Sequence, residues 1–217
     1  EGVIVLITRD RHYRSFGFEH RQEDDGRMMV YGRAVVFEQE TVIYEIDGVQ
    51  YKEKVDPRAF DEAKMDDVVL VVDHTGKPAA KTRNGTLKLF IRPDGLYIEA
   101  DLSKNATGRE LFEDIKNGFF DRMSFSFTVA EDDYNRDTHT RTIKKIKRLY
   151  DVSAVTFPAY EQTSLVARSW AEAQYEIEKK AAEAARAAEA AKEAEASSKN
   201  AEALALEKLR AQILAKF

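Results

Sequence analysis

Short apolar runs alternate with turn-forming residues through the first 168 positions, a pattern that predicts a domain built from β-strands. Turn signals separate several of the runs, namely Asp47-Gly48, Asn84-Gly85 and Pro93-Asp94-Gly95. The segments expected to be strands are 2–8, 28–37, 41–45, 49–54, 68–72, 85–91, 96–102, 123–130 and 141–156. Many short strands with hairpin turns predict a barrel or a sandwich.

Two helices are expected to interrupt the strands. The first begins at Asp56-Pro57, an N-cap followed by proline at the first helical position, and extends to about Met65. The second begins at Thr107, whose hydroxyl can cap the helix while Glu110 completes a capping box, and Gly118 can end it.

The chain changes character after residue 168. Residues 169–217 contain no glycine or proline and are mostly Ala, Glu, Lys and Arg, which favours helix. We expect a break or a new N-cap at 197–200, and beyond it an apolar face made of Leu206, Leu209, Ile213 and Phe217. The sequence therefore predicts a folded domain at 1–168 and a helical tail at 169–217; a flexible tail is the alternative.

Composition excludes several function classes. There is no cysteine among the 217 residues, so disulfides, thiolate metal sites and a cysteine nucleophile are excluded. The formal net charge of −5 argues against nucleic acid as the main partner. The longest apolar runs are too short for a membrane helix. The four histidines lack the i, i+4 spacing of a helical metal site, and we expect no metal and no cofactor.

One histidine has a distinctive context. His74 follows the apolar strand 68–72 and precedes the expected loop 75–78, whereas His12, His20 and His139 lie in polar stretches. A strand end holds a side chain rigidly and leaves it accessible, which suits a general base that exchanges protons near neutrality.

Two further segments carry candidate groups. Strand alternation in 123–129 puts the large apolar side chains on one face and Ser124, Ser126 and Thr128 on the other. That hydroxyl face is either an ordinary solvated face or a rigid position for a nucleophile. Asp151 is the acid in the apolar segment 149–159, so it needs either a basic partner such as Arg148 or a histidine.

These segments, in this order, resemble the caudovirus prohead serine protease family. Each motif is weak alone, but their order and spacing over residues 30–168 are specific. The matching stretches are 32–37, 55–60, 71–75, 85–87, 95–101, 108–126 and 149–160.

The resemblance implies a fold and a set of roles. The family looks related to the herpesvirus assembly protease, a β-barrel ringed by helices that usually acts as a dimer. It implies a mostly antiparallel β-barrel flanked by helices, here with a long C-terminal helical extension. Ser124 would be the nucleophile, His74 the base and Asp151 the third member, at a position where glutamate is usual. Asp73 is a weaker rival because successive strand side chains point apart.

We therefore expect an endopeptidase that cleaves the scaffold segment of the major capsid protein, and itself, inside the phage procapsid in the host cytoplasm. Its expected partners are that scaffold segment and other copies of the chain, without nucleic acid or membrane. The alternative is a catalytically silent scaffold or assembly protein with the same fold.

Overall fold

The computed structural model describes residues 18–156 and 164–214, with the side chains of 164–168, 207 and 209–214 left out. The expected strand at 2–8 lies outside the described residues. The chain divides into two compact units, Glu1–Arg168 and Ser169–Phe217. Among the described residues, no helix has the length and apolar character needed to cross a membrane.

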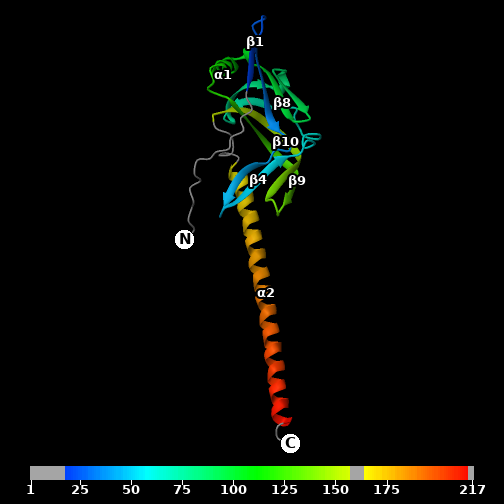
Figure 1. Cartoon of the computed structure of the whole chain (residues 1–217). Coiled ribbons are helices and arrows are strands. Elements are labelled where there is room, and N and C mark those ends of the chain that lie inside the picture. Colours follow the sequence, from blue (N-terminus) through cyan, green and yellow to red (C-terminus); the bar gives the residue numbers. More distant parts are fainter. Residues whose placement is uncertain (1–17, 157–163, 215–217) are drawn as a thin grey trace. The chain divides into compact units, whose positions relative to one another are not determined.

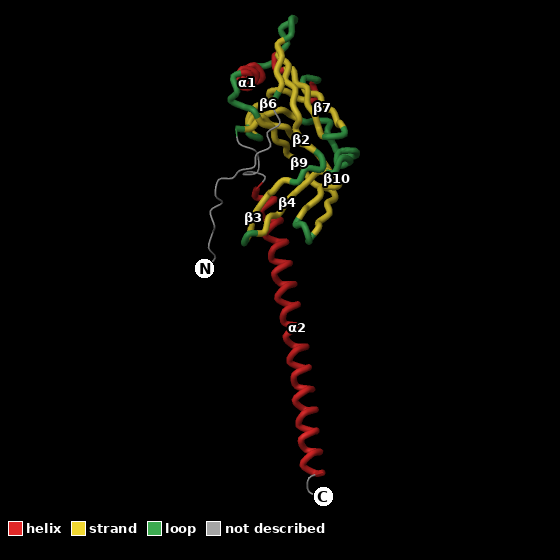
Figure 2. The backbone as a smooth tube through the Cα atoms, in the orientation of Figure 1, coloured by secondary structure: helices red, strands yellow, loops and turns green. Residues whose placement is uncertain are grey.

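The first unit contains two β-sheets (Figures 1 and 2). The four-stranded sheet has the order β1-β2-β8-β7, and the strands are β1 (Glu19–Gln22), β2 (Met28–Val36), β8 (Gly95–Asp101) and β7 (Leu87–Arg92). The six-stranded sheet has the order β3-β4-β10-β5-β6, with β9 paired to β10. Its strands are β3 (Thr41–Ile46), β4 (Val49–Val55), β5 (Val69–Val72), β6 (Thr75–Lys81), β9 (Arg122–Asn135) and β10 (Thr140–Val155).

The strand predictions were largely confirmed, but the barrel was wrong. Most pairings are antiparallel, whereas β10 pairs in parallel with both β4 and β5. On its other edge, β10 pairs with β9 along nearly its whole length. The sheet therefore branches at β10 instead of closing. Strands β2 and β9 approach each other at Gly32 and Met123, but no ladder of hydrogen bonds joins them in the described part of the chain.

The expected helix at 56–65 is also wrong, because this segment is a series of turns. Its backbone bonds span three residues, as in Ala59 N–H to Asp56 O (2.9 Å), and do not continue as an α-helix. Instead the segment bonds to β10: Ile146 N–H donates to Ala59 O (2.8 Å) and Leu149 N–H donates to Lys64 O (3.1 Å). These long-range bonds, with burial of Phe60, outweigh the local helix signal.

The segment 59–64 fills a gap along β10. Residues 140–143 of β10 pair with β4, and residues 151–154 pair with β5. Between them, the turns at 59–64 supply the backbone partners. The second edge of β10 is thus covered by three successive segments, which matters because a buried, unpaired backbone group costs about 1–3 kcal/mol.

One hydrophobic core serves both sheets and helix α1 (Ala106–Lys116). Its fully buried members include Val30, Leu70, Leu96, Leu102, Ile143, Leu149 and Val152. The expected helix at Thr107 is confirmed, but its cap is Asn105, whose side chain accepts from Gly108 N–H (2.6 Å). Asn105 Nδ2 also donates to Ala79 O (3.1 Å) and so fastens the helix to β6.

Helix α2 (Ser164–Leu214), one long coil in Figure 1, begins in the last residues of the first unit and makes up the described part of the second. The helical tail is confirmed, whereas the break expected at 197–200 is wrong. Serine and asparagine cost less than about 1 kcal/mol each in a helix, and Lys199 pairs with Glu195 at i, i+4 (2.6 Å) across this stretch. The short 3₁₀ segments η1 (Thr82–Asn84) and η2 (Leu102–Lys104) complete the elements.

Gly108 gives a test of this packing. A methyl group on an exposed helical glycine normally stabilises a protein by about 1 kcal/mol. Here a Cβ would lie 2.4 Å from Leu102 O and 3.0 Å from Ala79 O, both backbone atoms. We expect Gly108→Ala to destabilise the protein by about 1–3 kcal/mol in denaturant unfolding. Glu110→Ala, at an exposed position of the same helix, is the control and should change stability by less than about 0.5 kcal/mol. A stabilised Gly108→Ala protein would contradict the close approach of α1 to η2.

Candidate active site

The site begins with a tight turn between β5 and β6. Val72 pairs with Thr75 across the hairpin, so Asp73 and His74 are its two turn residues. Both have positive φ, 46° and 58°, as a type I′ turn requires. The stretch 75–78, expected to be a loop, is instead the start of β6. His74 is therefore held at a hairpin tip, in a backbone conformation that non-glycine residues seldom adopt.

Two contacts of Asp73 fix this turn to the end of β10. Asp73 N–H donates to Ala154 O (2.9 Å), and the Asp73 carboxylate accepts from Thr156 N–H (3.1 Å). The Asp73 side chain thus has a local structural role, which argues against it as the partner of the His74 ring.

Ser124 lies near the start of β9, on the face predicted from alternation. The residues at 123, 125, 127 and 129 pack against the core, as expected. The register places Ser124 directly opposite Ser153 of β10, and Ser126 opposite Asp151. Ser124 is 8% exposed, so this part of the hydroxyl face is buried and is not an ordinary solvated surface.

The structure brings the three predicted side chains together. His74 Nδ1 lies 2.6 Å from Asp151 Oδ1, and His74 Nε2 lies 2.9 Å from Ser124 Oγ. The side chains of His74 and Asp151 are 15% and 13% exposed. Along the chain, these contacts join residues 77 and 50 positions apart.

The hydrogen-bonding capacities of the groups fix the direction of these bonds. An ionised carboxylate can only accept, so Nδ1 carries the proton that it donates to Asp151. Nε2 is then an acceptor and receives the Ser124 hydroxyl proton. This is the order of donors that lets a serine lose its proton to histidine while a carboxylate orients the ring.

A fourth polar residue, Ser153, also contacts this group, and sequence reasoning missed it. Ser153 is fully buried, and its Oγ donates to Asp151 Oδ1 (2.8 Å). The available signal was the Asp-x-Ser spacing on β10, because residues i and i+2 of a strand share a face.

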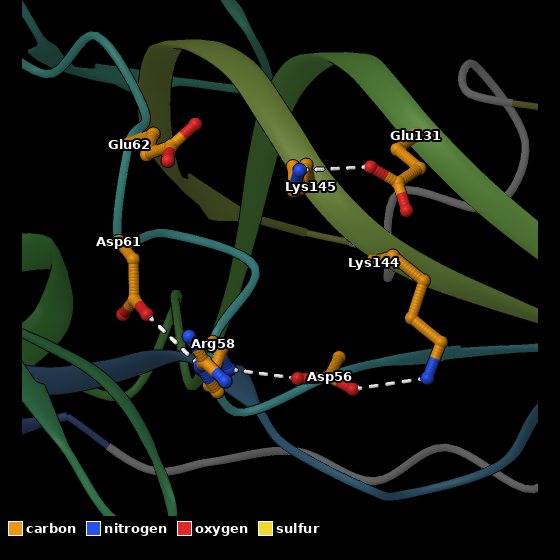
Figure 3. A pocket seen from close by; sticks show the side chains of 7 residues that line it. All are labelled: Asp56, Arg58, Asp61, Glu62, Glu131, Lys144 and Lys145. Carbon is orange, nitrogen blue, oxygen red and sulfur yellow. Dashed lines mark hydrogen bonds and ion pairs between the residues drawn. The ribbon is translucent and has the colours of Figure 1, made fainter.

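A separate depression of about 250 Å³ lies among charged side chains (Figure 3). Its lining residues are Asp56, Arg58, Asp61, Glu62, Glu131, Lys144 and Lys145. Here Lys144 pairs with Asp56 (3.2 Å) and Lys145 with Glu131 (2.9 Å). These pairs tie β10 to the turn segment and to β9. They explain the cluster structurally, and the depression includes none of the three predicted site residues.

Comparison with known proteins adds independent information. The chain is 36% identical over 74 residues to the prohead protease of Enterobacteria phage HK97, an alignment that covers 34% of this chain and 33% of that relative. The aligned part is thus about a third of that relative's length. No solved structure matches the chain significantly. A family model described as caudovirus prohead serine protease matches residues 16–176. Since that match covers most of the sequence, the chain belongs to the caudovirus prohead serine protease family.

Proposed function

We propose that this protein is the serine endopeptidase of a phage procapsid, with Ser124 as nucleophile, His74 as general base and Asp151 as the orienting acid. The observation that carries the proposal is the continuous chain of hydrogen bonds from Ser124 Oγ through the His74 ring to Asp151. Family membership supports the reaction class.

The proposed reaction is acyl transfer. His74 Nε2 takes the Ser124 proton as Oγ attacks the scissile carbonyl carbon, and backbone amides stabilise the oxyanion. Asp151 stabilises the imidazolium that forms. His74 then gives the proton to the leaving amine, and water hydrolyses the acyl-enzyme by the same route.

The proposed substrates are the scaffold segment of the major capsid protein and the protease itself. The HK97 relative is a prohead protease, which supports this class of substrate. Confinement inside the shell would raise the effective concentration of both substrates, so cleavage does not require the enzyme to bind them with high intrinsic affinity.

Removal of the nucleophile or the base tests the assignment. We expect Ser124→Ala and His74→Ala each to lower turnover by about a million-fold, because such groups act as a unit. Mass analysis of the purified protein and of procapsids would detect the lost products. Ser126→Ala is the matched control, since it removes a hydroxyl from the same face of β9. Activity that survives in folded Ser124→Ala, or that disappears only in Ser126→Ala, would contradict the assignment. A wild-type protein without proteolysis would favour the silent assembly protein.

The two aspartates can be separated by matched amide substitutions. Asp151→Asn should lower kcat by about a hundred- to ten-thousand-fold, because the ring loses the carboxylate that holds its tautomer. Asp73→Asn removes the same charge beside His74, yet keeps an acceptor for Thr156 N–H. Its rate should stay within about threefold of wild type.

Kinetics and melting temperature should be measured for both aspartate variants. If Asp151→Asn changes only the melting temperature, Asp151 is a structural partner. If Asp73→Asn loses as much activity as Asp151→Asn, the orienting role belongs to Asp73.

We propose that α2 recruits or orients the enzyme, either through another copy or through the helical scaffold of the capsid protein. Residues 181–196 are exposed throughout, so this stretch buries no side chain in the described structure. Among larger side chains, Leu204 and Leu206 are 53% and 51% exposed. Leu209 and Ile213 belong to the helix but their side chains, like all of Phe217, lie outside the described residues.

Truncation after Lys180 tests the role of the tail. This cut retains everything that the family model matches. We expect a folded enzyme that cleaves a short peptide at the wild-type rate but enters procapsids poorly, because the multivalent contact is lost. Normal packaging would contradict recruitment, and failure to fold would show that the tail belongs to the first unit.

A further inference from the structure

Ser153 occupies the centre of the candidate site without belonging to the expected triad. Its Cα pairs with Ser124 on β9 and, on the opposite edge of β10, with Val71 on β5. Residues 151–154 of β10 all lie between β9 and β5, and within this stretch Ser153 is the residue directly opposite Ser124. Its side chain is fully buried.

The Ser153 hydroxyl uses its hydrogen-bonding capacity on both partners of the proposed base-acid pair. It donates to Asp151 Oδ1 (2.8 Å) and accepts from the backbone N–H of His74 (3.2 Å). Its Oγ also lies 3.2 Å from His74 Nδ1. A serine hydroxyl has one proton and two lone pairs, so the two directional bonds fix where the proton points.

These contacts constrain both the orientation of the Asp151 carboxylate and the position of the His74 backbone. The bond to Asp151 occupies one lone-pair direction of Oδ1 and leaves the other for the imidazole. The bond from His74 N–H holds the hairpin tip, whose positive φ values are otherwise sparsely populated. One hydroxyl thereby sets both the orientation of the carboxylate and the position of the backbone that carries the ring.

We propose that Ser153 is a positioning residue, which acts on the reaction through His74 and Asp151 and does not touch the substrate. The proposal rests on the proposed function of the triad. Loss of the hydroxyl should lower kcat by about 10- to 100-fold, the usual range for a hydrogen bond to a charged group and for a misplaced catalytic side chain. KM should stay within about twofold, because substrate contacts are unchanged.

The sharpest test compares Ser153→Thr with Ser153→Val in the full chain. The two side chains have nearly the same shape, so any strain from the added methyl is common to both, and they differ in the hydroxyl. We expect Thr to keep most of the wild-type kcat and Val to show the full loss. The probes are a peptide that spans the self-cleavage junction, mapped by mass analysis, and the rate at which a fluorophosphonate labels Ser124.

Ser103→Ala provides a matched control. Ser103 Oγ donates to Asp101 Oδ1 (2.6 Å), which is the same Asp-x-Ser spacing at the junction of β8 and η2. Its loss should cost stability but leave kcat and the labelling rate unchanged. If Ser153 had only a structural role, its loss would likewise lower stability without changing kcat or the labelling rate.

A readout independent of proteolysis is the low-field proton resonance of His74 Nδ1–H in histidine-labelled protein. It should persist in Ser153→Thr and shift or broaden in Ser153→Val. Equal kcat in the two folded variants, with the resonance unchanged, would overturn the positioning role. If the wild-type protein neither cleaves the peptide nor is labelled, the proposed function fails, and the role of Ser153 is then judged from the resonance alone. An unchanged signal in Ser153→Val refutes that role, and a shifted signal supports it.

Discussion

The pairing of β10 on both edges is the constraint from which the rest of the arrangement follows. A strand buried in a sheet must satisfy its backbone groups, because each one left unpaired costs about 1–3 kcal/mol. Strand β9 does this along one edge, while β4, the turns at 59–64 and β5 share the other. Since β5 has to reach the C-terminal part of β10, its hairpin tip comes to lie beside Asp151 and Ser153. The position of His74 thus follows from the need to pair the backbone of β10 along its second edge.

The hairpin tip itself is costly, and its cost is offset by β10. Asp73 and His74 both adopt positive φ, where neither side chain has glycine's freedom. Asp and His tolerate this region better than most residues, and short polar side chains find local hydrogen bonds there. Bonds from this turn to Ala154, Thr156 and Ser153 hold it in place. Strain concentrated at a chemically reactive side chain and held by its surroundings is a recurring property of functional sites.

The sequence was most informative where local chemistry and tertiary structure agree. The Asp47-Gly48 turn has positive φ at both residues, and the alternation at 123–129 placed Ser124 on the correct face. The prediction failed where long-range bonds decide. Asp56-Pro57 has every local sign of a helix start, but the segment that follows forms backbone hydrogen bonds with the edge of β10 instead. Likewise, parallel pairing of β10 with β4 and β5 depends on crossovers that no periodicity reveals, so an open, branched sheet was expected to be a closed barrel.

The candidate site was partly predictable for the same reason. His74, Ser124 and Asp151 came from the order of motifs, and the structure brings all three into hydrogen-bond contact. Ser153 and Ser126 are both small hydroxyl residues on alternating strands, and the Asp-x-Ser spacing at 151–153 does not show which of them lies near His74. Their difference is one of register: Ser153 lies opposite Ser124 and within reach of the His74 backbone.

The wide separation of His74, Ser124 and Asp151 along the chain also affects when these side chains can meet. His74 lies 77 residues before Asp151 and 50 before Ser124. Closing such loops has an entropic cost that isolated side-chain contacts cannot offset, so they meet only after the strands have paired. Because β10 is the last strand of the sheet to be synthesised, a nascent chain carries Ser124 and His74 without the framework that joins them. Chain order therefore delays the contact between His74, Ser124 and Asp151 until β10 has been synthesised and paired.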